Sequence, residues 1–128
     1  MKFYESQNKQ DRLILNQRTK SYIPIDYIML LKGKANYTTF VLSDGREKVV
    51  AHTLKYFEHF LKNYGFQRVH RASMINPNYV KDYNKLTSII TMDNQMSVQI
   101  SRRRKEGFMS DLREKSIKFK VSKEGGQG

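Results

Sequence analysis

The stretch from Phe66 to Lys105 places the strongest constraint on what this chain can fold into. Within it lie two runs of alternating apolar and polar residues, which are joined at Asp93-Asn94. Successive side chains of a strand point to opposite faces, so these runs predict a β-hairpin with one buried face. Basic clusters, residues 68–71 and 102–105, flank the two runs. The sequence therefore predicts positive charge held at each end of a fixed β scaffold.

Short strand-like segments make up most of the rest of the chain. Pro24 lacks an N–H group, so the strand around it is expected at a sheet edge. Asp44-Gly45 supplies the positive φ of a tight hairpin turn. We expect a loop over 32–36, with its glycine and asparagine, and a two-residue turn at 84–85. The predicted strands cover residues 12–15, 21–25, 26–31, 37–42, 47–51, 66–70, 79–83, 86–92 and 96–100.

Helical spacing is convincing in one place. Leu54, Phe57, Phe60 and Leu61 form an apolar stripe, which we interpret as core, and Thr53 is placed to cap its start. Gly65 is the expected terminating residue. A single helical turn over 72–76 and a last helix from residue 102 to about 115, capped by Ser101, are also predicted. The expected fold class is mainly β with one or two short helices.

Length and charge define the broad class of protein. The 128 residues fit one domain, with a loose leader over 1–11, a domain over 12–115 and a largely disordered tail over 116–128. The formal net charge of +12 attracts polyanions, with nucleic acid expected before an anionic membrane. The simpler alternative is that the charge only aids solubility. No apolar run reaches the ~18–20 residues of a membrane span, so we expect a cytoplasmic protein without a membrane partner.

Catalytic and metal-binding chemistry find little support in the residues. There is no cysteine, and His52, His59 and His70 lack the spacing of metal ligands. No glycine-rich phosphate loop or pair of catalytic carboxylates occurs. We therefore expect no enzyme activity, cofactor, metal or small-molecule substrate.

The run Arg102-Arg103-Arg104 is more informative. Cations at a helix start oppose the helix dipole, and a bound phosphate would reverse that local cost. Arginine also suits guanine edges in the major groove, whereas lysines such as Lys34 suit phosphates. The alternative is that the three arginines simply point into solvent.

These residues resemble a known family. Phe66-Gln67-Arg68-Val69-His70-Arg71-Ala72-Ser73-Met74-Ile75-Asn76 is similar to the F-x-R-x-H-R/K-S-x-x-V/I-N signature of the LytTR DNA-binding domain. Ala35-Asn36-Tyr37 resembles the family's g-n-Y loop, and Val98-Gln99-Ile100-Ser101-Arg102-Arg103 resembles its closing motif. The match covers roughly residues 12–114, and several motifs recur in the family's order.

The resemblance implies an elongated domain of small sheets that binds double-stranded DNA through loops. It implies a transcription regulator of the response-regulator type found in two-component systems, acting on paired promoter repeats, with a second copy of the domain on the adjacent repeat. Base contacts are implied near Asn36 and Tyr37, at Arg71 and at Arg102, with Arg103 and Lys34 on phosphates. His70 and Asn76 also match motif positions. A structural role, in which they hold the loop, and a direct contact with DNA are given equal weight for both.

The chain departs from the family pattern in two respects. Ala72 replaces the usual serine, which removes a hydroxyl. A receiver domain needs about 120 residues, and this chain has no such length before the module, so a stand-alone regulator or an excised piece is expected.

Two other functions stay open from the sequence. Tyr37, Tyr79 and Tyr83 could stack unpaired bases in an RNA-binding module. The basic surface could instead dock a separate regulator, such as a receiver protein, through acidic groups.

Overall fold

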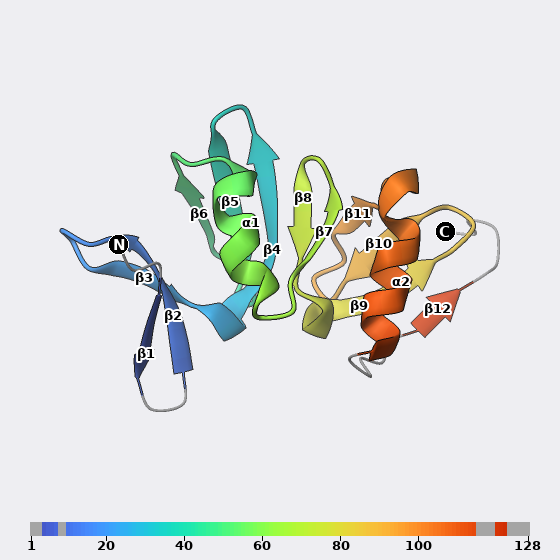
Figure 1. Ribbon diagram of the computed structural model, residues 1–128, viewed down its shortest axis with the longest axis horizontal. Coiled ribbons are helices and arrows are strands. Elements are labelled where there is room, and N and C mark those ends of the chain that lie inside the picture. Colours follow the sequence, from blue (N-terminus) through green and yellow to red (C-terminus); the bar gives the residue numbers. More distant parts are fainter. Residues whose placement is uncertain (1–3, 8–9, 115–119, 123–128) are drawn as a thin grey trace.

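The computed structural model describes residues 4–7, 10–114 and 120–122. Short strands dominate, and they form three small sheets that follow one another in chain order along the long axis (Figure 1). Two α-helices accompany them: α1 (Leu54–Lys62) and α2 (Lys105–Glu114). The mainly β fold class with two short helices is confirmed.

The N-terminal sheet contains β1 (Tyr4–Gln7), β2 (Gln10–Asn16) and β3 (Ser21–Pro24), all antiparallel. The expected loose leader over 1–11 is wrong for residues 4–7 and 10–11, because β1 pairs with β2 from Gln7↔Gln10 to Tyr4↔Leu13. Residues 1–3 and 8–9 of that leader lie outside the described residues. β3 is an edge strand, as its proline predicts.

The central sheet is antiparallel and has the order β6-β5-β4-β8-β7. Leu31, Phe40 and Met74 on one face pack with the apolar stripe of α1, and Leu30, Val41 and Ile75 on the other pack toward the third sheet. Its strands are β4 (Ile28–Lys34), β5 (Tyr37–Leu42), β6 (Glu47–Val50), β7 (Gln67–His70) and β8 (Ser73–Ile75).

The third sheet has the order β11-β10-β9-β12 and is covered by α2. Phe108 of α2 meets Tyr83 edge-on, with 5.4 Å between ring centroids. The predicted disordered tail is wrong for 120–122, which pair in parallel with β9; residues 116–119 and 123–128 lie outside the described residues. The strands are β9 (Val80–Asn84), β10 (Ile89–Met92), β11 (Ser97–Gln99) and β12 (Lys120–Ser122).

Three 3₁₀ turns join these elements: Ile25–Tyr27, Pro77–Tyr79 and Arg102–Arg104. The first lies between β3 and β4, and the second lies between β8 and β9. The third leads directly into α2. The first two let the chain change sheet within a few residues.

Several local predictions fail because strand pairing and turn hydrogen bonds set the bounds of the elements. β4 runs on to Lys34, so the predicted loop over 32–36 shrinks to the turn Ala35-Asn36, with Ala35 at φ 53°. The predicted helical turn over 72–76 is instead β8, because its backbone pairs with Leu30–Lys32 of β4. The turn at 84–85 extends to Ser88, since Asn84 Oδ1 accepts the N–H groups of residues 86 and 87.

The two basic clusters do not flank one hairpin. Residues 67–70 form β7 in the central sheet, whereas the predicted hairpin of β10 and β11 belongs to the third sheet. The 3₁₀ turn Pro77–Tyr79 separates the sheets and starts β9 in a new direction. The clusters therefore meet through packing between sheets, and not through a shared hairpin.

Candidate nucleic-acid interface

Three connecting segments gather at one end of the central sheet. They are the turn Ala35-Asn36, the turn Arg71-Ala72 and the segment Ser101–Arg104, and we call them together the loop end. The Gly33 N–H donates to the Ala72 carbonyl at 2.9 Å, which ties the first two segments together. The Ser101 N–H donates to the Val69 carbonyl at 2.8 Å and ties on the third. Figure 1 shows the two turns and the start of α2 along the upper side of the molecule.

Gly33 has a steric role at the first of these ties. A Cβ built on it would lie 3.3 Å from Cβ of Leu54, the first residue of α1. The helix start therefore packs almost directly on the backbone of β4. This close approach fixes α1 beside the loop end.

The loop end brings together the residues that the sequence predicted as DNA contacts. Tyr37 is 53% exposed beside the first turn. His70 is half-buried, immediately before the second turn. The remaining predicted residues are exposed: Lys34, Asn36, Arg71, Arg102 and Arg103. Residues that are almost 70 positions apart in the chain thus share one surface.

Two of the motif residues hold backbone in place. His70 Nδ1 accepts the N–H of Ala72 at 3.1 Å, across the Arg71 turn. Asn76 is only 3% exposed. Its Nδ2 donates to the Ile28 carbonyl at 3.0 Å and its Oδ1 accepts the Asn78 N–H at 3.1 Å. Asn76 therefore links β8 to β4 inside the protein.

Arg68 is a functional candidate whose role sequence reasoning missed. Its Nε donates to the His70 carbonyl at 2.9 Å and its Nη2 to the Arg71 carbonyl at 2.5 Å. Its Nη1 pairs with Glu58 of α1 at 2.5 Å, and the Arg68 side chain is only 12% exposed. In the sequence Arg68 looked like one more cation of the cluster 68–71. Nothing local distinguishes it, because Glu58 lies ten residues away on another element.

The Arg102–Arg104 segment differs from the predicted helix start. It is a 3₁₀ turn, and α2 begins at Lys105. Within the part of the chain that the structure describes, the Ser101 hydroxyl makes no cap bond, and its buried oxygen has no partner. The predicted cap is therefore wrong: the Ser101 N–H bonds to β7, while its side chain does not reach the turn.

Arg104 is the inward-facing member of the triplet. Burial lowers the pKa of Arg104, and the positive charges of Arg68 and Arg103 lower it further, whereas Glu58 opposes this effect. The arginine remains charged, because its ordinary pKa is far above neutral. Arg102 and Arg103 are thus left as the exposed cations of this segment.

Other functions gain less from the structure. Tyr83 is 2% exposed, and the Tyr79 hydroxyl donates to the Asp26 carbonyl, so of the three rings proposed to stack RNA bases Tyr37 is the one largely exposed. Among the described residues, no group of three His, Cys, Asp or Glu side chains could hold a metal. No helix in the described ranges is both long and apolar enough to cross a membrane.

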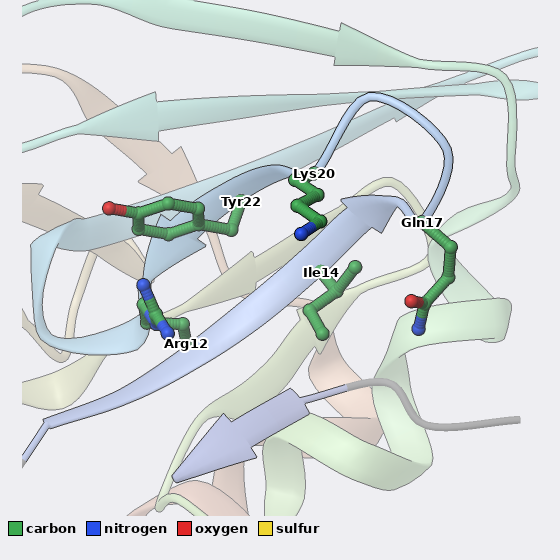
Figure 2. A pocket seen from close by; sticks show the side chains of 5 residues that line it. All are labelled: Arg12, Ile14, Gln17, Lys20 and Tyr22. Carbon is green, nitrogen blue, oxygen red and sulfur yellow. The ribbon is translucent and has the colours of Figure 1, made fainter. Parts of the chain in front are cut away.

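A pocket lies on the β2–β3 hairpin, and none of the residues predicted to contact DNA lines it (Figure 2). The Arg12 guanidinium lies over the Tyr22 ring, 4.3 Å from its centroid. Arginine often stacks on an aromatic face in this way. The pocket is lined by Arg12, Ile14, Gln17, Lys20 and Tyr22.

Comparison with known proteins agrees with this arrangement. The family model described as the LytTr DNA-binding domain matches residues 5–113. A solved structure with the same fold is the LytTr DNA-binding domain of a Bacillus cereus protein described as a methyl-accepting/DNA response regulator. It is 26% identical, with a TM-score of 0.65, over 82% of this chain and 98% of that chain. No curated protein matches the chain. The family match spans most of the chain and includes all three segments of the loop end, so the chain belongs to the LytTR family of DNA-binding domains.

Proposed function

We propose that the protein binds specific sequences in double-stranded DNA through the loop end and thereby regulates transcription. The observation that carries the proposal is that the bonds from Gly33 to Ala72 and from Ser101 to Val69 gather three connecting segments. Exposed cations lie on or beside these segments: Lys34, Arg71, Arg102 and Arg103. These bonds fix the segments relative to one another. A rigid set of loops can enter grooves in a defined register, which sequence-specific binding requires.

Separate roles follow from the chemistry of the exposed side chains. Arg71 and Arg102 are proposed to read base edges, because a guanidinium can donate two bonds to guanine O6 and N7. Asn36 and Tyr37 are proposed to contact bases from the first turn. Lys34 and Arg103 are proposed to contact phosphates, which set register without carrying sequence information. His70 is placed to support the Arg71 turn from within.

The proposal also covers the arrangement of the protein on DNA, the type of regulation and the location in the cell. Two copies would occupy paired repeats near a promoter, since one loop end covers a short site. The description of the Bacillus cereus relative as a response regulator supports a role in regulation of the two-component type. We also propose that the protein acts in the cytoplasm, where its DNA target would lie, and that its role is binding and not catalysis.

Selection from a random duplex DNA library at about 150 mM salt, close to physiological ionic strength, tests the proposal. Enrichment of a paired motif is the expected result. Binding without enrichment, lost steeply as salt rises, would show that the net charge only makes the protein adhere to polyanions. Single-stranded RNA serves as the competitor. Tighter binding of the protein to this RNA than to duplex DNA would contradict the proposal.

A further inference from the structure

We infer that Arg68 is a positioning residue: it holds the Arg71 turn in one conformation and so determines the base preference that Arg71 confers. The inference rests on the proposed function, in which Arg71 reads a base. It adds that a largely buried side chain, which does not itself contact the base, governs this reading.

The geometry of the guanidinium carries the inference. One planar group donates to two successive carbonyls of the turn, those of His70 and Arg71, and to a carboxylate of α1. Together with the bond from Ala72 to His70 Nδ1, these bonds fix the backbone on both sides of Arg71. The direction in which the Arg71 side chain leaves the turn is set by that backbone.

Glu58 ties this arrangement to the core. It lies on α1 between the buried residues Phe57 and Leu61, so its helix is held by packing. Glu58 is itself largely buried, with 19% of its side chain exposed. Lys62 also approaches Glu58, at 3.6 Å, but its side chain is 60% exposed and supplies a weaker contact. The carboxylate therefore directs Arg68 inward.

These contacts also argue against a direct DNA contact by Arg68. Its side chain is only 12% exposed, whereas Arg71, in the turn itself, is an exposed residue. The charge of Arg68 is already balanced by Glu58. A phosphate contact would require the guanidinium to leave three partners that include an oppositely charged one.

Lysine cannot replace this function. Its ammonium keeps the charge but is a compact donor without the fixed fork of a guanidinium, so it cannot hold the two carbonyls and the carboxylate in the same geometry. Arg68→Lys therefore keeps the positive charge at this position and removes the fixed hydrogen-bonding geometry. Arg46→Lys is the matched control, because Arg46 also pairs with a carboxylate, Asp44 at 2.7 Å, but in the turn at the opposite end of the central sheet.

The test is a double-mutant cycle on the duplex enriched by selection and on versions of it with single base pairs changed. Arg71→Ala, Arg68→Lys, the double variant and Arg46→Lys are compared by their ratio of affinities for the two kinds of duplex. Arg68→Lys is expected to lower preference about tenfold at the same base pair as Arg71→Ala, within the range of one bidentate contact. The double variant should lose little more than Arg71→Ala alone. Arg46→Lys should leave the ratio unchanged.

Other results overturn the inference in distinguishable ways. If Arg71→Ala lowers the base preference, and the double variant loses the product of the two single-variant factors, Arg68 does not act through Arg71. If Arg68→Lys weakens binding to all duplexes equally, it contacts phosphate. If Arg71→Ala leaves preference intact, the assignment of Arg71 to a base fails, and this inference with it.

Amide hydrogen exchange in the DNA-free protein provides a readout that does not depend on a target. Arg68→Lys should accelerate exchange at Ala72 severalfold while exchange in β5 stays unchanged, because the turn opens locally without unfolding the sheet. Unchanged exchange at Ala72 would show that the turn holds its shape without the guanidinium.

Discussion

Arg68 and Arg71 are three residues apart and chemically identical, yet the structure places one inside the protein and the other in solvent. The difference arises from their partners: two turn carbonyls and Glu58 surround Arg68, whereas Arg71 lies at the tip of the turn. The same division separates Arg104 from Arg102. At the loop end, burial decides which arginines support the surface and which are free to meet a partner.

Replacing the exposed arginines should change specificity, while replacing a lysine should not. Arg71→Ala and Arg102→Ala are each expected to cost about 1–3 kcal/mol of binding free energy and to relax preference at one base pair. Lys34→Ala should weaken all duplexes about equally, because a phosphate contact does not depend on the base. Affinities for the selected duplex and its single-base variants measure both effects. An equal loss on every duplex for all three variants would contradict these roles.

Asn76 should matter for stability and not for recognition. Removing its amide in Asn76→Ala deletes the hydrogen bonds to the Ile28 carbonyl and the Asn78 N–H, which is expected to lower the free energy of unfolding by about 1–3 kcal/mol. Urea denaturation measures the change, and Asn78→Ala, at an exposed position, is the control. A loss of base preference in folded Asn76→Ala would show instead that this residue contacts DNA.

At the scale of elements, the sequence predicts what depends on local pattern. The β5 strand and the α1 stripe were predicted closely, because their own residues carry the signal. Strand-forming residues follow one another in β5, and apolar residues recur with the helical period of 3.6 in α1. Residues 73–75 were not, because a three-residue segment has no readable period and becomes a strand by pairing with β4. The prediction for the leader failed likewise, since β1 is a strand through its pairing with β2 and the residues 4–7 have no readable apolar period.

The candidate site divides in the same way. Arg71, Arg102 and the first turn were found through the motifs that carry the family resemblance. The bonds that join these segments could not be found, because Gly33 N–H and Ser101 N–H pair with carbonyls far along the chain. The role of Arg68 was missed for the same reason, because its partner Glu58 lies on another element.

The packing of β9 against α2 predicts a pH effect on stability. Burial raises the pKa of Tyr83, so the folded protein holds the phenol proton more tightly than the unfolded chain does. The resulting stability is complete below the unfolded pKa, about 10, and is lost as pH rises through the folded value. Urea denaturation between pH 8 and 11 should show wild type losing more stability than Tyr83→Phe does. Parallel curves for the two proteins would contradict this account.

At the scale of the whole molecule, the central and third sheets together form one platform for the loop end. The central sheet supplies two segments of the loop end, and the third sheet delivers the last one through the Ser101–Val69 bond. α1 packs on one face of the central sheet, and the other face of the central sheet packs toward the third sheet. Because the sheets are small and mostly antiparallel, most turns are short, which limits how far the loops can move independently.

The charge of this platform should appear in the salt dependence of binding. Lys32 is exposed on β4, two positions before Lys34, and we expect it to contact phosphate together with Lys34 and Arg103. Three phosphate contacts give a slope of about −2.7 for log affinity against log salt. Affinity for the selected duplex should then fall about 40-fold between 50 and 200 mM salt. Lys34→Ala should make the slope shallower by about one unit, as expected for one lost phosphate contact. Arg46→Ala, at the opposite end of the central sheet, should leave it unchanged. Equal slopes for both variants would mean that the net charge of +12, and not the loop end, governs the electrostatics of binding.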